Sequence, residues 1–198
     1  MSNNYDRYDG FDEQRYNRRG ISYYVLRKTA DKTIIPYLSK IKNKKCLEVG
    51  VGYGYYKNIY FDDNRVIGYD VNAQLVKNLS IETIVGKADE ISKKVKERFD
   101  YVLSFFMTEY LNKEELKKFI DQGLKMLNPQ GIFCTTIILK KGMGGMYTYL
   151  ARMKGIKKYS YSMNEIKEIL GGTEYKVYPL RSLLGIPFAV LLEVKNER

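Results

Sequence analysis

Leu47-Glu-Val-Gly-Val-Gly-Tyr-Gly54 joins a short apolar run to three closely spaced glycines. A short apolar run that ends in glycine is typical of a β-strand buried in a parallel sheet. Glycine lets the backbone turn tightly and lets a ligand lie against bare main chain. Because open parallel sheets bind their ligands beyond the carboxyl ends of the strands, the segment predicts a ligand-binding loop at that edge.

Strand-like and helix-like segments alternate outward from this loop. Strands are expected at 46–50, 66–70, 83–85, 101–106, 132–139, 174–178 and 187–194. Two of the helices between them begin with a capping box, formed by Asn112 with Glu115 and by Ser162 with Glu165. The alternation predicts an α/β fold with a mostly parallel, seven-stranded sheet and helices on both faces.

The chain of 198 residues suits a single domain overall. Residues 1–44 are expected to form an N-terminal helical cap segment, and residues 45–198 to form the domain that contains the glycine loop. Within the first segment, apolar residues from Tyr23 to Ile41 recur at helical spacing. Pro36 is expected to divide this stretch into two helices.

Composition excludes several classes of function. The chain has no histidine, which removes Ser-His hydrolase chemistry and most zinc chemistry, so we expect no metal ligand. Cys46 and Cys134 lie in apolar runs and are interpreted as buried thiols. No apolar run approaches the roughly 20 residues of a membrane span, and the polar start lacks a secretion signal, so a cytoplasmic location is expected. The net charge of +11 fits either an anionic partner or a biased overall composition.

Two common nucleotide-binding motifs were compared with the glycine segment, and neither matches it. A dinucleotide loop needs its third glycine one position later than Gly54, and a phosphate loop needs a Gly-Lys-Ser/Thr that is missing here. In addition, Glu48 precedes the glycines. A carboxylate at this place suits a cationic ligand better than a pyrophosphate.

Glu48-Val-Gly50-Val-Gly52-Tyr-Gly54 resembles the first motif of the class I S-adenosylmethionine-dependent methyltransferases. The resemblance continues in order through Asp70, through Gly86-Lys-Ala-Asp-Glu90, through the segment from Phe99 to Leu111, and through Leu127-Asn-Pro-Gln-Gly-Ile132. In the last motif Gln130 replaces a glycine, at a structural turn. The match covers roughly residues 45 to 139 and implies a Rossmann-like methyltransferase fold.

The resemblance also implies a cofactor, S-adenosyl-L-methionine, and the residues that bind it. Asp70 takes the place of the acid that accepts the two ribose hydroxyls, and Asp89 that of the acid that contacts adenine. The full set of expected cofactor-binding residues is Glu48, Gly50, Gly52, Gly54, Asp70, Ala88, Asp89, Ser104 and Phe105. The structural alternatives are that Asp70 caps a helix and that Asp89 favours a helix N-terminus.

The methyl acceptor is less well defined by the sequence. Glu109 and Tyr110 follow the fourth strand, so Glu109 is a candidate to orient or deprotonate the acceptor; the alternative is a helix-capping or surface carboxylate. Tyr23, Met146 and Tyr147 are candidates for the acceptor pocket, because they lie in the N-terminal segment and in the stretch from Met143 to Tyr161, outside the motifs that carry the resemblance.

A small-molecule acceptor is favoured for two reasons. The fourth strand ends in Ser104-Phe-Phe-Met107, unlike the motif of amino-methyltransferases that act on DNA bases. The length also leaves no room for a separate RNA-binding module. The alternatives are an RNA methyltransferase, a non-catalytic protein that keeps the cofactor pocket, and a nicotinamide-dependent reductase. The sequence gives no oligomeric state.

Overall fold

A seven-stranded sheet forms the centre of the computed structural model, which describes residues 21–196. Its strand order is β3-β2-β1-β4-β5-β7-β6. The strands are β1 (Lys45–Val49), β2 (Arg65–Asp70), β3 (Glu82–Val85), β4 (Phe99–Ser104), β5 (Leu127–Ile138), β6 (Tyr175–Arg181) and β7 (Pro187–Lys195). The order reverses between β1 and β4, and a sheet opens a crevice at such a switch point.

The first five strands pair in parallel, and β7 runs antiparallel between β5 and β6. In the central pairs, Leu47 lies opposite both Ile67 and Val102. The carboxyl ends of β1, β2 and β4 therefore meet at one edge of the sheet. This agrees with the mostly parallel α/β fold expected from the sequence.

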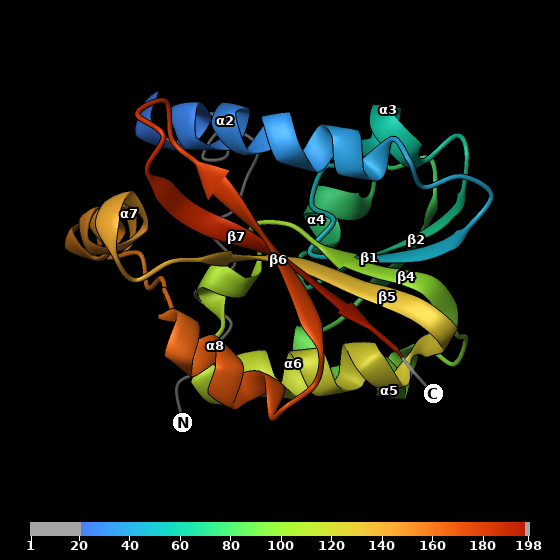
Figure 1. Cartoon of the computed structure of the whole chain (residues 1–198). Coiled ribbons are helices and arrows are strands. Elements are labelled where there is room, and N and C mark those ends of the chain that lie inside the picture. Colours follow the sequence, from blue (N-terminus) through green and yellow to red (C-terminus); the bar gives the residue numbers. More distant parts are fainter. Residues whose placement is uncertain (1–20, 197–198) are drawn as a thin grey trace, which may run out of the picture.

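Helices cover both faces of the sheet (Figure 1). They are α2 (Ile21–Leu38), α3 (Lys57–Tyr60), α4 (Ala73–Val76), α5 (Ile91–Lys94), α6 (Lys113–Lys125), α7 (Gly142–Met153) and α8 (Met163–Leu170), with short 3-10 turns η2 (Ala88–Glu90) and η3 (Thr108–Tyr110). The first of these helices lies over one face and α6 and α8 over the other, so the molecule has three layers. Each face has its own apolar core, one built on Ala30 and Ile34, the other on Leu116 and Phe119.

Both expected capping boxes are present. Asn112 caps α6 with Glu115, and Ser162 caps α8 with Glu165. Each cap satisfies backbone N–H groups that the first turn of a helix leaves without a partner. Helix α8 ends at Gly171, which adopts the left-handed conformation that glycine allows at a helix end.

The expectation that Pro36 divides the N-terminal helical stretch is wrong. Helix α2 runs from Ile21 to Leu38 with Pro36 inside it. The proline stands in the last turn, where the helix ends two residues later and little of its hydrogen bonding is lost. The apolar residues of α2 lie in the same core as the sheet.

Three strands differ by more than one residue from their expected limits. The fourth runs from Phe99 to Ser104, not 101–106, because the backbone changes direction at Phe106, where φ is 55°. The fifth begins at Leu127, because the turn that contains Gln130 already pairs with its neighbours, and Gln130 has a φ of 61°. The sixth extends to Arg181. Cys46 and Cys134 are buried free thiols, as expected. Among residues 21–196, no helix has the length and apolar character needed to cross a membrane.

Candidate functional site

The glycine loop turns through left-handed backbone conformations directly after β1. Gly50, Gly52 and Gly54 have φ angles of 74°, 53° and 66°. A Cβ atom at Gly50 would lie 2.6 Å from the side chain of Met107, whereas a Cβ at Gly52 would meet no atom within 4 Å. Gly50 is therefore required by packing, and Gly52 exposes bare main chain to open space, as a ligand-binding loop needs.

Asp70, at the end of β2, is tied to the glycine loop. One carboxylate oxygen accepts from the N–H of Gly52 at 2.9 Å, and the other accepts from the N–H of Asn72 at 2.9 Å. Burial raises the pKa of the Asp70 carboxyl, and the backbone donors Asn72 and Gly52 oppose this rise. Each carboxylate oxygen keeps a further acceptor position, so the group can bind ligand hydroxyls while it holds the loop.

Glu48 lies beneath the loop and is 3% exposed. The hydroxyl of Tyr60 donates to it at 2.5 Å. Burial raises the pKa of Glu48 to about 7, while the Tyr60 hydrogen bond and the charge of Arg27 lower it and the charge of Asp70 raises it. A buried carboxyl with a raised pKa gains most from a nearby cation.

Two charged residues of α2, Arg27 and Asp31, contact the residues that follow the glycine loop. The sequence motifs did not indicate these contacts. The guanidinium of Arg27 lies 3.9 Å from the centre of the Tyr55 ring and 5.0 Å from that of Phe106. Asp31 accepts hydrogen bonds from the hydroxyls of Tyr55 and Tyr56, at 2.8 and 3.0 Å. The only sequence signal for these residues is their spacing of one helical turn.

The segment after β3 lies beside Asp70. The N–H of Gly86 donates to the carbonyl of Asp70 at 2.9 Å, and the hydroxyl of Tyr69 donates to the carbonyl of Lys87 at 2.9 Å. Ala88 and Asp89 form the 3-10 turn η2 that follows, and both are half-buried. The structure thus places them at the same edge of the sheet as the glycine loop.

The end of β4 changes direction at Phe106, whose φ of 55° is rare for a bulky residue. Ser104 is fully buried, and its hydroxyl has no hydrogen-bond partner among the described residues. Phe105 packs edge-on against Tyr56, with ring centres 5.1 Å apart. Both side chains are thus buried at the carboxyl end of β4, and Phe105 reaches the aromatic residues that follow the glycine loop.

Glu109 is the centre of a buried polar cluster beneath α7. Lys158 forms an ion pair with Glu109 and also donates to the hydroxyl of Tyr147, and the exposed fractions of the Lys158 and Glu109 side chains are 5% and 0%. Tyr147 donates to Glu109 at 3.1 Å. The second carboxylate oxygen of Glu109 has no hydrogen-bond partner within the described part of the chain. We call Glu109, Tyr147 and Lys158 the buried triad.

The other acceptor candidates separate into two groups. Tyr110 adjoins the buried triad, because the Lys158 ammonium lies 4.9 Å from the centre of its ring. Met146 does not, since it lies on the outer face of α7 and is 53% exposed. Tyr23 is in α2, but its side chain lies outside what the structure describes. The sequence did not indicate Lys158, because nothing distinguishes it from the other lysines of the chain.

Taken together, the loop and its carboxylates define a class of protein. Bare main chain at Gly52 and two buried carboxyls, Glu48 and Asp70, meet at the switch point of a mostly parallel sheet. Such an arrangement in a Rossmann-like sheet suits a nucleotide, and its charges favour a cationic ligand. S-adenosylmethionine, with ribose hydroxyls, a sulfonium and an ammonium, fits this donor set.

Comparisons with known proteins agree with the resemblance. Residues 47–135, slightly less than half of the chain, match the family model described as a methyltransferase domain. Two solved structures of similar fold hold SAH and SAM, respectively. The matched range contains all nine expected cofactor-binding residues, while Tyr147 and Lys158 lie beyond it. A search of curated sequences gave no significant match.

Solved structures agree on the fold. Magnesium protoporphyrin IX methyltransferase (ChlM) from Synechocystis PCC 6803, with bound SAH, has a TM-score of 0.70 at 15% identity and covers 96% of each chain. A SAM-dependent methyltransferase from Archaeoglobus fulgidus has a TM-score of 0.71 at 15% identity, over 93% of this chain and 100% of its own. The N-methyltransferase NodS from Bradyrhizobium japonicum WM9 has a TM-score of 0.69 at 16% identity, over 98% and 96%.

Proposed function

We propose that this methyltransferase acts on a small molecule bound beyond the end of β4, between η3 and α7. The observation that carries the proposal is the buried triad. Burying a lysine and a glutamate away from water costs roughly several kcal/mol for each ion. The attraction between the two charges often does not offset this cost, so such a pair contributes little to stability. Groups buried beneath a helix suit a ligand that is enclosed on several sides, in contrast to a polymer that lies across a surface. ChlM, which is similar in fold, is named for a small-molecule acceptor.

The cofactor half of the proposal assigns residues to each part of the nucleoside. Asp70 accepts the ribose hydroxyls, the Gly50–Gly54 loop supplies bare main chain, and Glu48 faces the positive charges. Ala88, Asp89 and Phe105 flank the adenine side, and Ser104 supports the floor. The Arg27 guanidinium, which lies 3.9 Å from the centre of the Tyr55 ring, is assigned to the amino-acid carboxylate. When bound, the cofactor supplies an activated methyl group on a sulfonium.

The acceptor half assigns roles to the triad. Glu109 touches the acceptor through its second oxygen and orients it or removes its proton. Lys158 holds the Glu109 charge in place, and Tyr147 fixes the geometry of the pair. Tyr110 lines the same side. This assignment needs no histidine, which the chain does not contain.

Two further parts of the proposal concern the whole chain. The segment 1–44 is proposed to cap the domain formed by 45–198; within its described part, residues 21–44, Arg27 and Asp31 contact the tyrosines after the loop. The protein acts in the cytoplasm, where buried cysteines such as Cys46 and Cys134 remain reduced.

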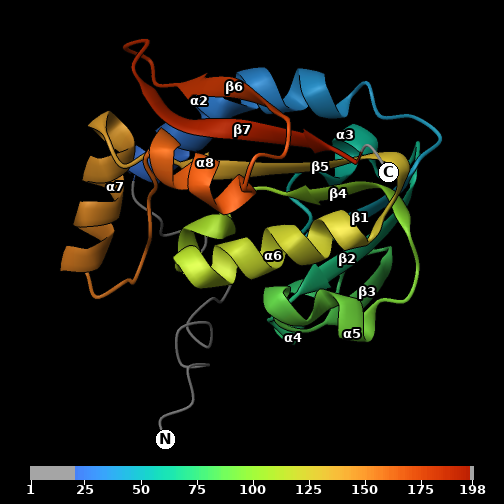
Figure 2. The ribbon, with the colours of Figure 1, turned by 60° about the horizontal axis from the view of Figure 1, so that its bottom comes forward.

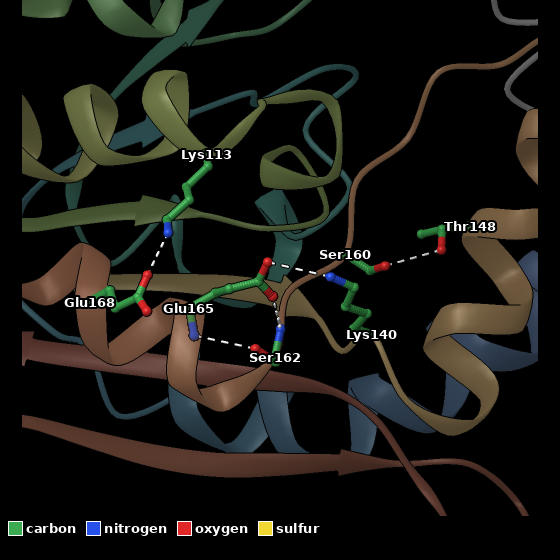
Figure 3. A network of polar contacts seen from close by, with 7 residues as sticks. All are labelled: Lys113, Lys140, Thr148, Ser160, Ser162, Glu165 and Glu168. Carbon is green, nitrogen blue, oxygen red and sulfur yellow. Dashed lines mark hydrogen bonds and ion pairs between the residues drawn. The ribbon is translucent and has the colours of Figure 1, made fainter.

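The test is turnover measured as S-adenosylhomocysteine release over a panel of small acceptors. With an accepted substrate, Glu109→Gln should lower kcat by about a hundredfold or more, the range of general acid–base catalysis. Glu168→Gln is the matched control, because Glu168 also pairs with a lysine, Lys113, but on the exposed surface of α8 (Figure 3). Its kcat should not change.

Because Glu109→Gln leaves the Lys158 ammonium buried with a neutral partner, a second variant guards against misfolding. Tyr147→Phe removes only one hydroxyl and should lower kcat while S-adenosylmethionine affinity stays the same. Unchanged turnover in both variants would remove the acceptor role. Salt-sensitive RNA binding with RNA methylation, and no small acceptor, would favour the RNA alternative.

A further inference from the structure

Helix α7 carries its large apolar side chains outward. The exposed fractions are 53% for Met146, 63% for Tyr149, 44% for Leu150 and 70% for Met153. Spacings of three and four residues put these side chains on one face of the helix. The face that packs on the protein is made of small residues, namely Gly144, Thr148 and Ala151. This arrangement is the reverse of the usual one, in which large apolar residues face the core.

The turn between β6 and β7 presents a second group of apolar side chains. Leu183, Leu184 and Ile186 are 71%, 79% and 43% exposed. The turn itself is well formed, since the N–H of Gly185 donates to the carbonyl of Ser182 at 2.9 Å. Turns in proteins normally carry polar residues at such positions. Adjacent leucines at the tip therefore need a reason other than folding.

The two groups lie at the same end of the molecule. A Cβ atom on Gly142, at the start of α7, would be 3.4 Å from Ile186. Both views show α7 and the β6–β7 turn at this end (Figures 1 and 2). We call the whole set the apolar end; it consists of Met146, Tyr149, Leu150, Met153, Ile156, Leu183, Leu184 and Ile186.

Polar contacts connect α7, and the residues just before it, to the rest of the fold. The hydroxyls of Thr148 and Ser160 lie 3.2 Å apart, and Lys140 pairs with Glu165 at 3.4 Å (Figure 3). The same Glu165 belongs to the capping box of α8. The outer face is thus presented by an anchored element.

The segment that carries α7 is rich in positive charge. Residues 140–160 contain six basic residues and no acidic one. Of these, Lys158 is buried in the triad and Lys140 pairs with Glu165. The exposed remainder, together with one residue at the β6–β7 turn, forms what we call the basic rim: Lys141, Arg152, Lys154, Lys157 and Arg181.

We propose that the apolar end docks on an anionic lipid bilayer, with Leu183 and Leu184 entering the headgroup region and the basic rim lying against the lipid charges. An apolar face bordered by Lys and Arg is the composition of elements that lie in a membrane interface. A second copy of the chain would suit the surface poorly, because a two-fold interface would bring two basic rims together. This docking goes beyond the methyl-transfer chemistry and does not depend on the acceptor.

Flotation of the full chain with vesicles tests the proposal. Binding is expected to vesicles of phosphatidylcholine with phosphatidylglycerol, and to be much weaker to phosphatidylcholine alone. Leu183→Ser with Leu184→Ser should weaken binding by about tenfold or more, through loss of apolar burial. Arg152→Gln, Lys154→Gln and Lys157→Gln combined should weaken it by about a hundredfold, because each basic residue near such a surface contributes about a factor of five.

The matched control removes the same charge elsewhere, through Lys93→Gln, Lys118→Gln and Lys125→Gln on α5 and α6, which should bind as the original chain does. All substituted side chains are exposed, and an unchanged unfolding midpoint checks that each variant folds. Failure to float with anionic vesicles at low salt would overturn the proposal. So would equal loss in the control, or a lipid-free dimer abolished by the leucine substitutions, since the surface would then serve a second copy.

Discussion

Gly50 and Gly52 are two positions apart, yet an added methyl group would meet different surroundings at each. At Gly50 it would press on Met107, and at Gly52 it would enter open space. One glycine is thus needed for the loop to fold against β4, and the other for a ligand to approach the main chain. Sequence patterns cannot separate these two needs, because both produce a glycine.

Alanine substitutions should separate them. Gly50→Ala is expected to lower the free energy of unfolding by about 3 kcal/mol, from left-handed strain and overpacking. Gly52→Ala should cost only about 1–2 kcal/mol of stability from the left-handed strain but weaken S-adenosylmethionine binding. Urea unfolding and calorimetry measure the two effects.

Gly155→Ala is the matched control, because Gly155 shares the φ of 74° with Gly50 but has no atom within 4 Å of a Cβ. It isolates the backbone strain from the clash. If Gly50→Ala and Gly155→Ala were equally stable, the contact with Met107 would not be what requires glycine.

Glu48 gives the site a dependence on pH. Its pKa of about 7 means that the carboxyl is largely neutral at pH 6 and ionised at pH 8. A cationic cofactor needs the ionised form, so affinity should rise by about tenfold between these values. Glu48→Gln should flatten the profile of affinity against pH, as measured by calorimetry.

The same shift has the opposite effect on the stability of the ligand-free protein. Because the folded-state pKa of Glu48 exceeds its ordinary value, the folded state binds the proton more tightly than the unfolded state does. Its contribution to stability is therefore complete below the ordinary carboxyl pKa and is lost as the pH rises toward 7. A stability increase over that range that Glu48→Gln abolishes would contradict the assignment.

At the scale of elements, local signals predicted some helices and missed another. The helices α6 and α8 begin at capping boxes that can be read directly from the sequence. The α7 helix begins Gly142-Met-Gly-Gly145, and glycine has a low helix propensity, so no local pattern indicated it. Its position depends on packing against β7, which sequence spacing does not contain. The prediction from Pro36 was wrong for a related reason. The energetic cost of a proline in a helix depends on where the helix ends, which the sequence did not show.

The cap of α6 is open to a direct test. Asn112→Ala should lower the free energy of unfolding by about 1 kcal/mol, because a backbone N–H loses its acceptor. Asn112→Asp keeps an acceptor at the positive end of the helix and should retain the stability. Chemical denaturation of both variants measures the difference, and equal losses in the two would show that the side-chain bond contributes nothing.

At the scale of the whole molecule, the cofactor side of the site was more predictable than the acceptor side. Glu48, the glycines and Asp70 stand at strand ends, so the alternation of strands and helices places them together. The buried triad joins residues as distant as Glu109 and Lys158, and Arg27 reaches the loop from α2. Such pairs arise only when the layers pack, and a lysine that becomes buried is not marked in the sequence.

The proposed functions use different parts of the molecule. The glycine loop and Asp70 lie at the carboxyl ends of β1 and β2, the buried triad lies under α7, and the apolar end lies on the outer side of the same helix. In these proposals helix α7 contributes Tyr147 to one site and Met153 to another. Variants on its two sides should affect turnover and vesicle binding independently.

Calorimetric titration with S-adenosylmethionine, comparing the natural chain with Asp70→Ala, tests most directly that the glycine loop and Asp70 together hold the cofactor. The natural chain should bind one equivalent. Asp70→Ala should lose two charge-assisted hydrogen bonds to the cofactor, each contributing about 1.5–3 kcal/mol. Binding should therefore weaken by about a hundredfold or more. Equal affinity in the two proteins, or no binding to the natural chain, would contradict the account.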